Sequence, residues 1–226
     1  MKKIQIIIPA FNEEKSISKV LENLSSNKLK KDVVIDKIIV VDDGSCDATC
    51  AIANKFPKVS VFSHKVNRGL GAAVRTGLRI CRDLNAKYVV KLDADGQHDV
   101  NDIKKIIKPL FENKADIVYG KRILNFKTTI IRQIGNKCFS YLMKLLTSWD
   151  IKDSQPGIFA INEDCLKGIK IFGNYNYTQQ VLLSSQLNGM RFQHVDVSFF
   201  KRASGNSFVN LSYIYKALLQ ILVLII

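Results

Sequence analysis

The sequence is poor in acidic residues. Its 226 residues include 20 Asp and Glu against 34 Lys and Arg, which gives a formal net charge of +14. A charge of this size predicts an anionic partner: nucleic acid, an anionic membrane surface or a phosphorylated substrate. The basic residues are spread along the chain, without a basic amphipathic arm or zinc-finger spacing, so we expect no nucleic-acid partner.

Cysteines are few and lack the spacing of a disulfide framework or a metal site. The five are Cys46, Cys50, Cys81, Cys138 and Cys165. Cys46 and Cys50 lie one helical turn apart, but no second pair and no nearby histidine completes a zinc site. We therefore expect reduced thiols and a cytosolic setting.

Features of exported and modular proteins are also missing. Met1 to Lys3 leads straight into an apolar run that Pro9 and Asn12 interrupt too early for a signal peptide. There are no repeats, no low-complexity segment and no linker rich in Pro or Ser. We expect one domain, residues 1–210, followed by an apolar C-terminal segment, residues 211–226.

What the sequence does have is an alternation of apolar strands and helical patterns. Strands are predicted at residues 4–8, 38–41, 59–62, 88–92 and 117–119, and helices at 17–24, 47–56, 67–84 and 100–111. Further on, helices are predicted at 134–146 and 181–187, an edge strand at 158–161 and a strand at 192–200. This alternation favours an α/β fold, with a mostly parallel central sheet and helices on both faces.

Two carboxylates follow the strand at residues 88–92. Asp93 and Asp95 lie where this buried strand ends, and such a pair is costly unless a positive charge neutralises it. A hard divalent cation does so and accepts phosphate oxygens as further ligands. Since ligands of parallel sheets bind at the carboxyl ends of the strands, we expect 9–13, 42–43 and 93–95 to lie on one edge.

Four motifs in the first hundred residues together resemble the GT-A glycosyltransferases of family 2, nearest to dolichyl- or polyprenyl-phosphate sugar transferases. They are Ile8-Pro9-Ala10-Phe11-Asn12-Glu13, Val41-Asp42-Asp43-Gly44-Ser45, Asn67-Arg68-Gly69-Leu70-Gly71-Ala72-Ala73 and Asp93-Ala94-Asp95-Gly96-Gln97-His98. Later stretches at 120–122, 153–157 and 202–207 are similar to further family motifs. The resemblance runs from about residue 4 to 208 and implies a GT-A fold.

The resemblance also implies roles on the donor side. Asp93, Asp95 and Gln97 would hold a divalent metal, Mg²⁺ or Mn²⁺, at the diphosphate of a nucleotide sugar. The nucleotide-sugar pocket would be formed by Pro9, Ala10, Phe11, Asn12, Glu13, Asp42, Asp43, Gly71 and Asp93. The residues alone leave a structural interpretation open: a helix cap for Asn12 and Glu13, and a β-turn for 42–45.

Three arginines are the positive candidates, because a guanidinium group suits phosphate. By resemblance, Arg122 and Arg132 bind the phosphate of a lipid acceptor and Arg202 reaches the donor diphosphate. With Asp95 and Gln97 they form the predicted catalytic set. An exposed arginine is otherwise simply solvated.

The chain departs from the family on the acceptor side. Gln179-Gln180 stands where the family often has Glu, His194-Val195-Asp196 where it often has Glu-Val-Pro, and Phe208 where a basic or small residue is usual. We expect His98 to lie beside the metal site, and His64 and His194 to be structural.

From residue 217 to 226 only Gln220 is polar, and it continues a polar stripe from Ser212 and Lys216. Ten helical residues cover about 15 Å of a hydrocarbon core of about 30 Å. We expect this segment to lie in the membrane interface. The alternatives are a core helix, a contact in a homo-oligomer, or the start of a truncated membrane segment.

The resemblance implies an inverting transferase. It would move a hexose, mannose or glucose, from GDP-mannose or UDP-glucose to polyprenyl or dolichyl phosphate, as a peripheral protein at the cytoplasmic membrane face. One alternative is a polysaccharide, glycolipid or protein acceptor, with Asp153 as general base. Another is a non-catalytic subunit that binds nucleotide sugars.

Overall fold

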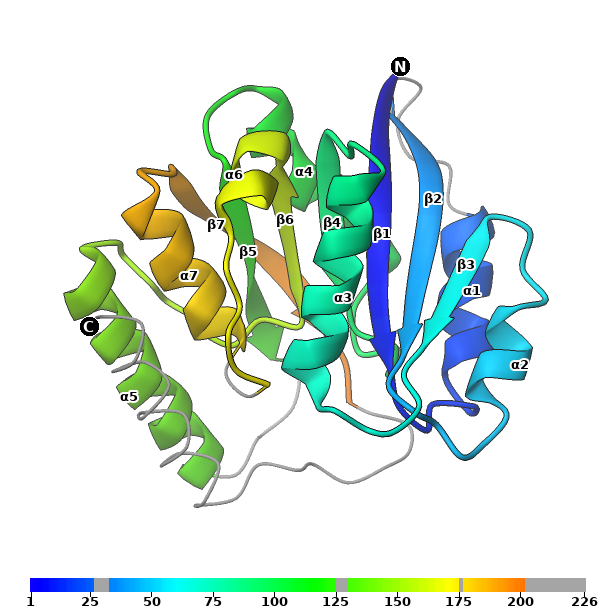
Figure 1. Cartoon of the computed structure of the whole chain (residues 1–226). Helices are drawn as coiled ribbons and strands as arrows, with labels where there is room; N and C mark the ends of the chain where they lie inside the picture. Colours follow the sequence, from blue (N-terminus) through cyan, green and yellow to red (C-terminus); the bar gives the residue numbers. More distant parts are fainter. Residues whose placement is uncertain (27–32, 125–129, 175–176, 202–226) are drawn as a thin grey trace.

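The computed structural model describes residues 1–26, 33–124, 130–174 and 177–201, and Figure 1 shows a central sheet between two layers of helices. The strands are β1 Lys2–Ala10, β2 Val33–Asp42, β3 Val59–Ser63, β4 Tyr88–Leu92, β5 Ile117–Leu124, β6 Ile158–Asn162 and β7 Phe192–Phe199. The α-helices are α1 Ile17–Ser26, α2 Thr49–Ala53, α3 Leu70–Asp83, α4 Ile103–Phe111, α5 Ile130–Thr147, α6 Glu163–Gly168 and α7 Tyr177–Leu187. Arg202 and the C-terminal segment 211–226 lie outside the described residues.

The seven strands form one sheet in the order β3-β2-β1-β4-β6-β5-β7. β1 is parallel to β2 and β4, β2 to β3, and β5 to β7. β6 is antiparallel to both of its neighbours, β4 and β5, so the other described strands all point the same way. The predicted mostly parallel sheet is confirmed.

The position predicted for β6 is wrong. Residues 158–161 were expected at an edge of the sheet because Pro156 precedes them, but β6 pairs on both sides. All four of its apolar side chains are fully buried, as is typical of a strand covered on both faces. Pro156 lies before the strand and removes no hydrogen bond from it.

Helices cover both faces of the sheet, as predicted. α1, α2 and α4 contribute to one apolar core, and α3, α5, α6 and α7 to the other. Along β1 the side chains alternate between the two: Ile6 and Ile8 belong to the first core and Ile7 to the second.

Two helices begin later than predicted. α2 begins at Thr49, because the carboxylate of Asp47 accepts a hydrogen bond from the Thr49 N–H (3.0 Å) and turns the chain before the helix. α3 begins at Leu70, after Gly69 with φ of +94°, a conformation that suits glycine.

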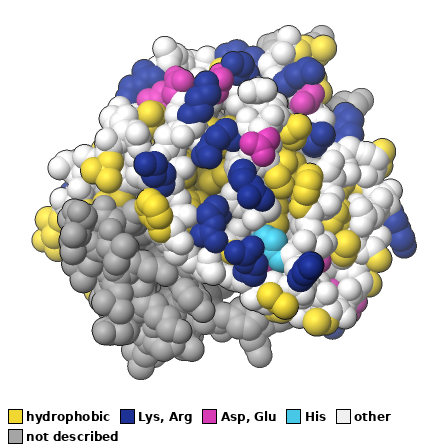
Figure 2. All heavy atoms as spheres, in the orientation of Figure 1, with side chains coloured by type: hydrophobic (Ala, Val, Ile, Leu, Met, Phe, Trp, Pro, Cys, Tyr) yellow, Lys and Arg dark blue, Asp and Glu magenta, His cyan; other side chains and the backbone are white. Residues whose placement is uncertain are grey.

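The carboxyl ends of the parallel strands meet at one edge, the lower one in Figure 1. Ala10 pairs with Asp42 in register, and β4 ends beside them, so the three predicted segments 9–13, 42–43 and 93–95 share this edge as expected. The start of β6 reaches the same edge, because β6 runs in the opposite direction. Lys and Arg side chains are scattered over the face seen in Figure 2.

Candidate active site at the carboxyl edge of the sheet

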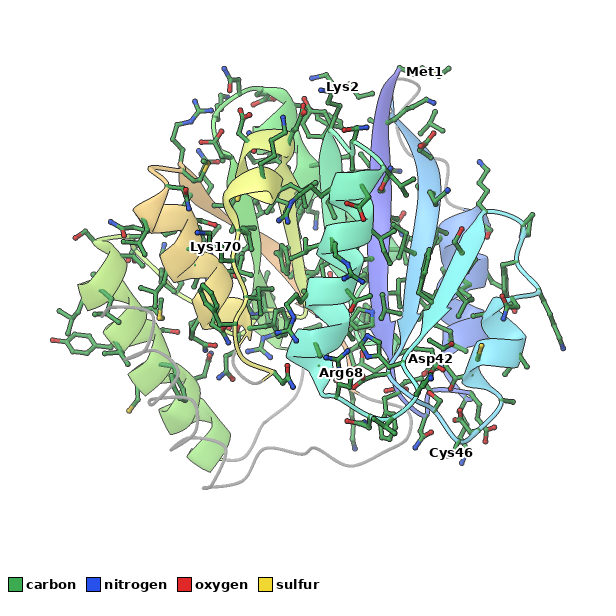
Figure 3. All side chains as sticks on the ribbon, in the orientation of Figure 1. Met1, Lys2, Asp42, Cys46, Arg68 and Lys170 are labelled. Atoms are coloured by element: carbon green, nitrogen blue, oxygen red, sulfur yellow. The ribbon has the colours of Figure 1, made fainter. Side chains whose placement is uncertain are left out.

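The loops after β1 and β2 are joined to each other. The N–H of Asn12 donates to Ser45 Oγ (2.9 Å), and Asn12 Oδ1 accepts from the N–H of Cys46 (2.9 Å). Asn12 has a φ of +53°, which asparagine tolerates better than most residues. Figure 3 shows Asp42, Cys46 and Arg68 gathered at this lower edge.

Glu13 and Asp42 both have structural roles here. The carbonyl of Glu13 accepts from the N–H groups of Ser16 (3.0 Å) and Ile17 (2.9 Å), and its carboxylate accepts from Ser16 Oγ (2.6 Å). Asp42 Oδ1 accepts from the N–H of Ser45 (3.2 Å), which closes a turn. The turn at 42–45 is therefore present, the Glu13 carbonyl closes a turn just before α1, and Asn12 links the two loops.

Asp43 supports the loop before α3. It is buried and accepts from the N–H groups of Arg68 (3.0 Å) and Gly69 (2.7 Å), and it contacts His64 Nδ1 (2.6 Å). The other nitrogen of His64 lies 3.0 Å from Thr76 Oγ1. The structural role expected for His64 is confirmed.

Gly71 permits a close backbone approach, and its partner is the chain itself. The Gly71 N–H donates to the carbonyl of Asn174 (3.1 Å), and a Cβ at Gly71 would lie 2.8 Å from that carbonyl oxygen. Nearby, the Gln180 side-chain oxygen accepts from the N–H groups of Phe172 (2.8 Å) and Gly173 (3.0 Å). A glutamate at 180 would offer the same kind of acceptor, so this departure from the family preserves the contact.

Asp93 has a positive partner inside the protein. Lys91, whose side chain is fully buried, forms an ion pair with Asp93 and donates to the carbonyl of Gly157 (3.1 Å). The side chain of Asp93 is 26 % exposed. Sequence reasoning missed this pair, although a lysine within the apolar run of β4 was a visible signal.

Asp95 and Gln97 lie in the loop after β4, and this loop is fastened to the end of β7. Asp95 Oδ1 accepts from the Gln97 N–H (3.1 Å). The side-chain amide of Gln97 donates to the carbonyl of Phe200 (2.7 Å), and the Phe200 N–H donates to the Gln97 carbonyl (2.8 Å). Two hydrogen bonds between Gln97 and Phe200 thus hold the loop, while Asp95 stays partly exposed.

His98 lies beside Asp93, as expected. A Cβ added at Gly157 would lie 2.1 Å from His98 Nε2 and 2.4 Å from Asp93 Oδ2. Burial lowers the pKa of His98 to about 4, so the imidazole is neutral at pH 7. Neither ring nitrogen has a hydrogen-bond partner among the described residues.

Arg122 and Asp153 form a bidentate ion pair. Arg122 Nε lies 2.7 Å from Asp153 Oδ2, and Arg122 Nη2 lies 3.0 Å from Oδ1. Burial alone would raise the pKa of Asp153, but the charge and hydrogen bonds of Arg122 hold that pKa below its usual value. Asp153 is therefore a weak base with both oxygens occupied, which argues against its role as general base.

The remaining predicted residues are placed only in part. Arg132 lies in the first turns of α5, but its side chain is outside the described atoms. His194 Nε2 accepts from the N–H of Lys152 (2.9 Å), in keeping with the structural role expected for it.

The site suits a divalent cation that takes part of its coordination from a substrate. Asp93 and Asp95 are oxygen donors on one partly exposed loop. Within the described ranges, no group of three or more His, Cys, Asp or Glu residues could hold a metal alone. Mg²⁺ typically binds to one or two carboxylates plus phosphate oxygens, and this donor set fits that chemistry.

Comparison with known proteins identifies the family. Residues 5–169 match the family described as Glycosyl transferase family 2. The chain belongs to this family. It is a glycosyltransferase with the GT-A fold, as the resemblance implied.

Two relatives of this family-2 chain are named as sugar transferases of dolichyl or undecaprenyl phosphate. It is 35 % identical over 212 residues to the UDP-N-acetylglucosamine–dolichyl-phosphate N-acetylglucosaminyltransferase of Methanococcus voltae, covering 85 % of this chain and 76 % of the relative. It is 25 % identical over 219 residues to the undecaprenyl-phosphate mannosyltransferase of Micrococcus luteus, covering 91 % and 86 %.

A solved structure supports the fold. Glucosyl-3-phosphoglycerate synthase from Mycobacterium tuberculosis, in complex with Mn²⁺, UDP and glucosyl-3-phosphoglycerate, aligns with a TM-score of 0.77 at 18 % identity. The alignment covers 99 % of this chain and 80 % of the synthase.

Proposed function

We propose that this glycosyltransferase moves a sugar from a nucleotide sugar to the phosphate of a polyprenyl or dolichyl lipid, with inversion and with a divalent metal. The observation that carries this proposal is the Arg122–Asp153 pair. It supports the proposal in two ways: Arg122 lies toward the carboxyl end of β5, on the sheet edge that carries the predicted donor loops, and Asp153 is unsuited to deprotonate a hydroxyl group. An acceptor that is already anionic needs no such base.

On the donor side, the loops at 9–13 and 42–43 bind the nucleotide. Asp93, Asp95 and Gln97 would hold Mg²⁺ or Mn²⁺ at the diphosphate. When bound, the cation neutralises the charge that develops on the leaving diphosphate. The fastening of Gln97 to Phe200 supports this assignment, because it keeps the loop after β4 in one position.

On the acceptor side, Arg122 binds the lipid phosphate, helped by Arg132, and Arg202 reaches the diphosphate. An acceptor oxygen attacks the anomeric carbon from the side opposite the diphosphate. A bond forms between that oxygen and the anomeric carbon as the bond to the diphosphate breaks, which inverts the configuration. The products are a lipid-phosphate sugar and a nucleoside diphosphate.

The acceptor implies a membrane setting. None of the helices in the described part of the chain is long and apolar enough to cross a membrane. We place the protein at the cytoplasmic membrane surface as a peripheral enzyme, held by its basic surface and by residues 211–226.

The test is a transfer assay with purified protein, Mn²⁺ and a short polyprenyl phosphate. GDP-mannose, UDP-glucose and UDP-N-acetylglucosamine are compared as donors, since the relatives named above differ in their sugar. We expect one of them to give a lipid-linked product. Transfer to a hydroxyl acceptor but not to the lipid phosphate would overturn the proposal, and donor binding without hydrolysis or transfer would indicate a non-catalytic subunit.

Two variants separate the donor and acceptor sides. Asp95→Ala should abolish metal-dependent donor binding in calorimetry while the protein stays folded. Arg122→Ala should reduce transfer by roughly tenfold to more than a hundredfold, the effect of losing a charge-assisted hydrogen bond, with little change in donor affinity. Equal losses of transfer and donor affinity would place Arg122 on the nucleotide side.

A further inference from the structure

Lys91 is a charged side chain buried in the protein, one residue before β4 ends at the carboxyl edge of the sheet. It belongs to β4, two residues before Asp93, and its side chain is 0 % exposed. Buried lysines are rare unless they are paired. The ion pairs of Lys87 and Lys167 with Glu163, in contrast, involve lysines that are mostly exposed.

The ammonium group of Lys91 has three partners. It contacts the Asp93 carboxylate, donates to the Gly157 carbonyl (3.1 Å) and lies 5.2 Å from the centre of the Tyr177 ring. These partners belong to the end of β4, the start of β6 and the start of α7. The positive charge is therefore fixed in place and cannot swing out to solvent.

This fixed charge changes what the Asp93–Asp95 loop offers to a cation. Lys91 neutralises the charge of Asp93 from within the protein. The loop therefore presents one negative charge fewer to a bare divalent cation. A nucleotide diphosphate, which is an anion, is attracted by the same lysine.

We propose that Lys91 sets the charge of the donor site through Asp93: it weakens the site for a bare divalent cation and strengthens it for the nucleotide diphosphate. This inference rests on the proposed function, since it takes Asp93 and Asp95 as the metal-binding pair. Lys91 is then a positioning residue that acts through Asp93.

The test compares Lys91→Met and Lys91→Gln with a matched control, Lys87→Gln. Lys87 lies just before the opposite end of β4 and carries the same charge, but it is exposed and far from the catalytic edge along the strand. Calorimetry measures the affinity for Mn²⁺ without nucleotide, the affinity for UDP and GDP without metal, and each affinity in the presence of the other ligand. Melting curves check that every variant is folded.

We expect both Lys91 variants to bind bare Mn²⁺ about tenfold more tightly and metal-free nucleotide about tenfold more weakly, because a nearby fixed charge acts on the two ligands with opposite sign. The two opposite effects add in the complex with both ligands, so the coupling factor should stay the same, and Lys87→Gln should match the wild type. If the role of Lys91 is purely structural, its loss should lower the affinity for both ligands together. That result would overturn the inference.

A measurement on the wild type keeps the inference testable if the Lys91 variants fail to fold. The unmodified protein should bind bare Mn²⁺ weakly but metal-free UDP or GDP measurably, because Lys91 opposes the cation and attracts the diphosphate. Tight binding of bare Mn²⁺ without any binding of metal-free nucleotide would overturn the role of Lys91. If the wild type binds no metal even with nucleotide, the proposed metal-dependent transfer itself fails, so the two failures are distinguishable.

Discussion

At the scale of single residues, the acceptor side that we propose depends on the contact between Arg122 and Asp153. Asp153 holds two nitrogens of the guanidinium group and also accepts from the Gln155 N–H (3.1 Å). The guanidinium also lies 5.3 Å from the centre of the Phe199 ring. These contacts fix the direction of Arg122 before any acceptor binds, which lowers the entropy lost when a phosphate is bound.

Asp153→Asn should therefore raise the KM for the lipid phosphate by about tenfold, with a smaller change in kcat, because the orientation of Arg122 is loosened. Nucleotide affinity should not change. Steady-state kinetics and calorimetry measure the two effects. A general base would behave differently: its loss lowers kcat by roughly a hundredfold or more, so a collapse of kcat at unchanged KM would contradict the positioning role.

The same pair predicts a pH dependence of stability. The pKa of Asp153 is lower in the folded protein than its ordinary value, so its ion pair adds stability above the unfolded pKa of about 3.9. That contribution is lost as the pH falls through the lower, folded pKa. The melting temperature of the wild type should exceed that of Asp153→Asn at pH 7, and the difference should shrink below about pH 4. A constant difference would contradict this account.

Some residue positions follow from the sequence and others do not. Asp93 and Asp95 were located correctly because an apolar run ends just before them, which is a local pattern. The pairing of Arg122 with Asp153 joins residues 31 positions apart, and no periodicity in the sequence records it. The burial of Lys91 was missed, although a lysine within the apolar run of a strand that is covered on both faces was a visible signal.

At the scale of elements, α3 carries the loop that Asp43 supports, and its distance from β1 is set by a glycine. A Cβ at Gly77 would lie 2.4 Å from Ile7 Cγ2, and Ile7 is fully buried. The start of α3 also meets Asn174 through Gly71. A shift of α3 would therefore disturb both the Gly71–Asn174 contact and the loop that Asp43 holds at the carboxyl edge of the sheet.

Gly77→Ala should destabilise the protein by about 1–3 kcal/mol, since overpacking a dense core outweighs the better helix propensity of alanine. The matched control is Gly135→Ala in α5, where an added Cβ meets nothing within 4 Å. That variant should be neutral or stabilised by up to about 1 kcal/mol. Urea unfolding measures both, and equal effects of the two substitutions would refute the packing argument.

The order and type of the elements could be predicted, but not all of their pairing. Continuous apolar runs and 3.6-residue periodicity are local signals, and they located most strands and helices. The insertion of β6 between β4 and β5 joins segments about seventy and forty residues apart, which depends on the whole packing of the sheet. The starts of α2 and α3 moved by two and three residues where a side chain or a glycine turns the chain, and α5 and α7 begin four residues earlier than predicted.

At the scale of the whole molecule, net charge and the C-terminal segment are the features that would bring the enzyme to the proposed lipid acceptor. The net charge of +14 favours anionic membrane surfaces, where each basic residue near the surface contributes about 1 kcal/mol. Residues 211–226 are strongly apolar, with one polar stripe through Ser212, Lys216 and Gln220. Apolar contact and charge attraction together are the combination that holds peripheral proteins on membranes.

We therefore predict that the full chain floats with liposomes that contain anionic lipid, and that a variant lacking residues 212–226 stays in the soluble fraction but still binds nucleotide sugar. High salt should weaken attachment only partly, because salt screens charge attraction but not apolar burial. The rival interpretation is a helix packed into the protein's own core or into a homo-oligomer contact. If that rival interpretation holds, the deletion lowers the melting temperature sharply and the full chain does not bind liposomes. Flotation of both proteins, with melting curves beside it, decides between them.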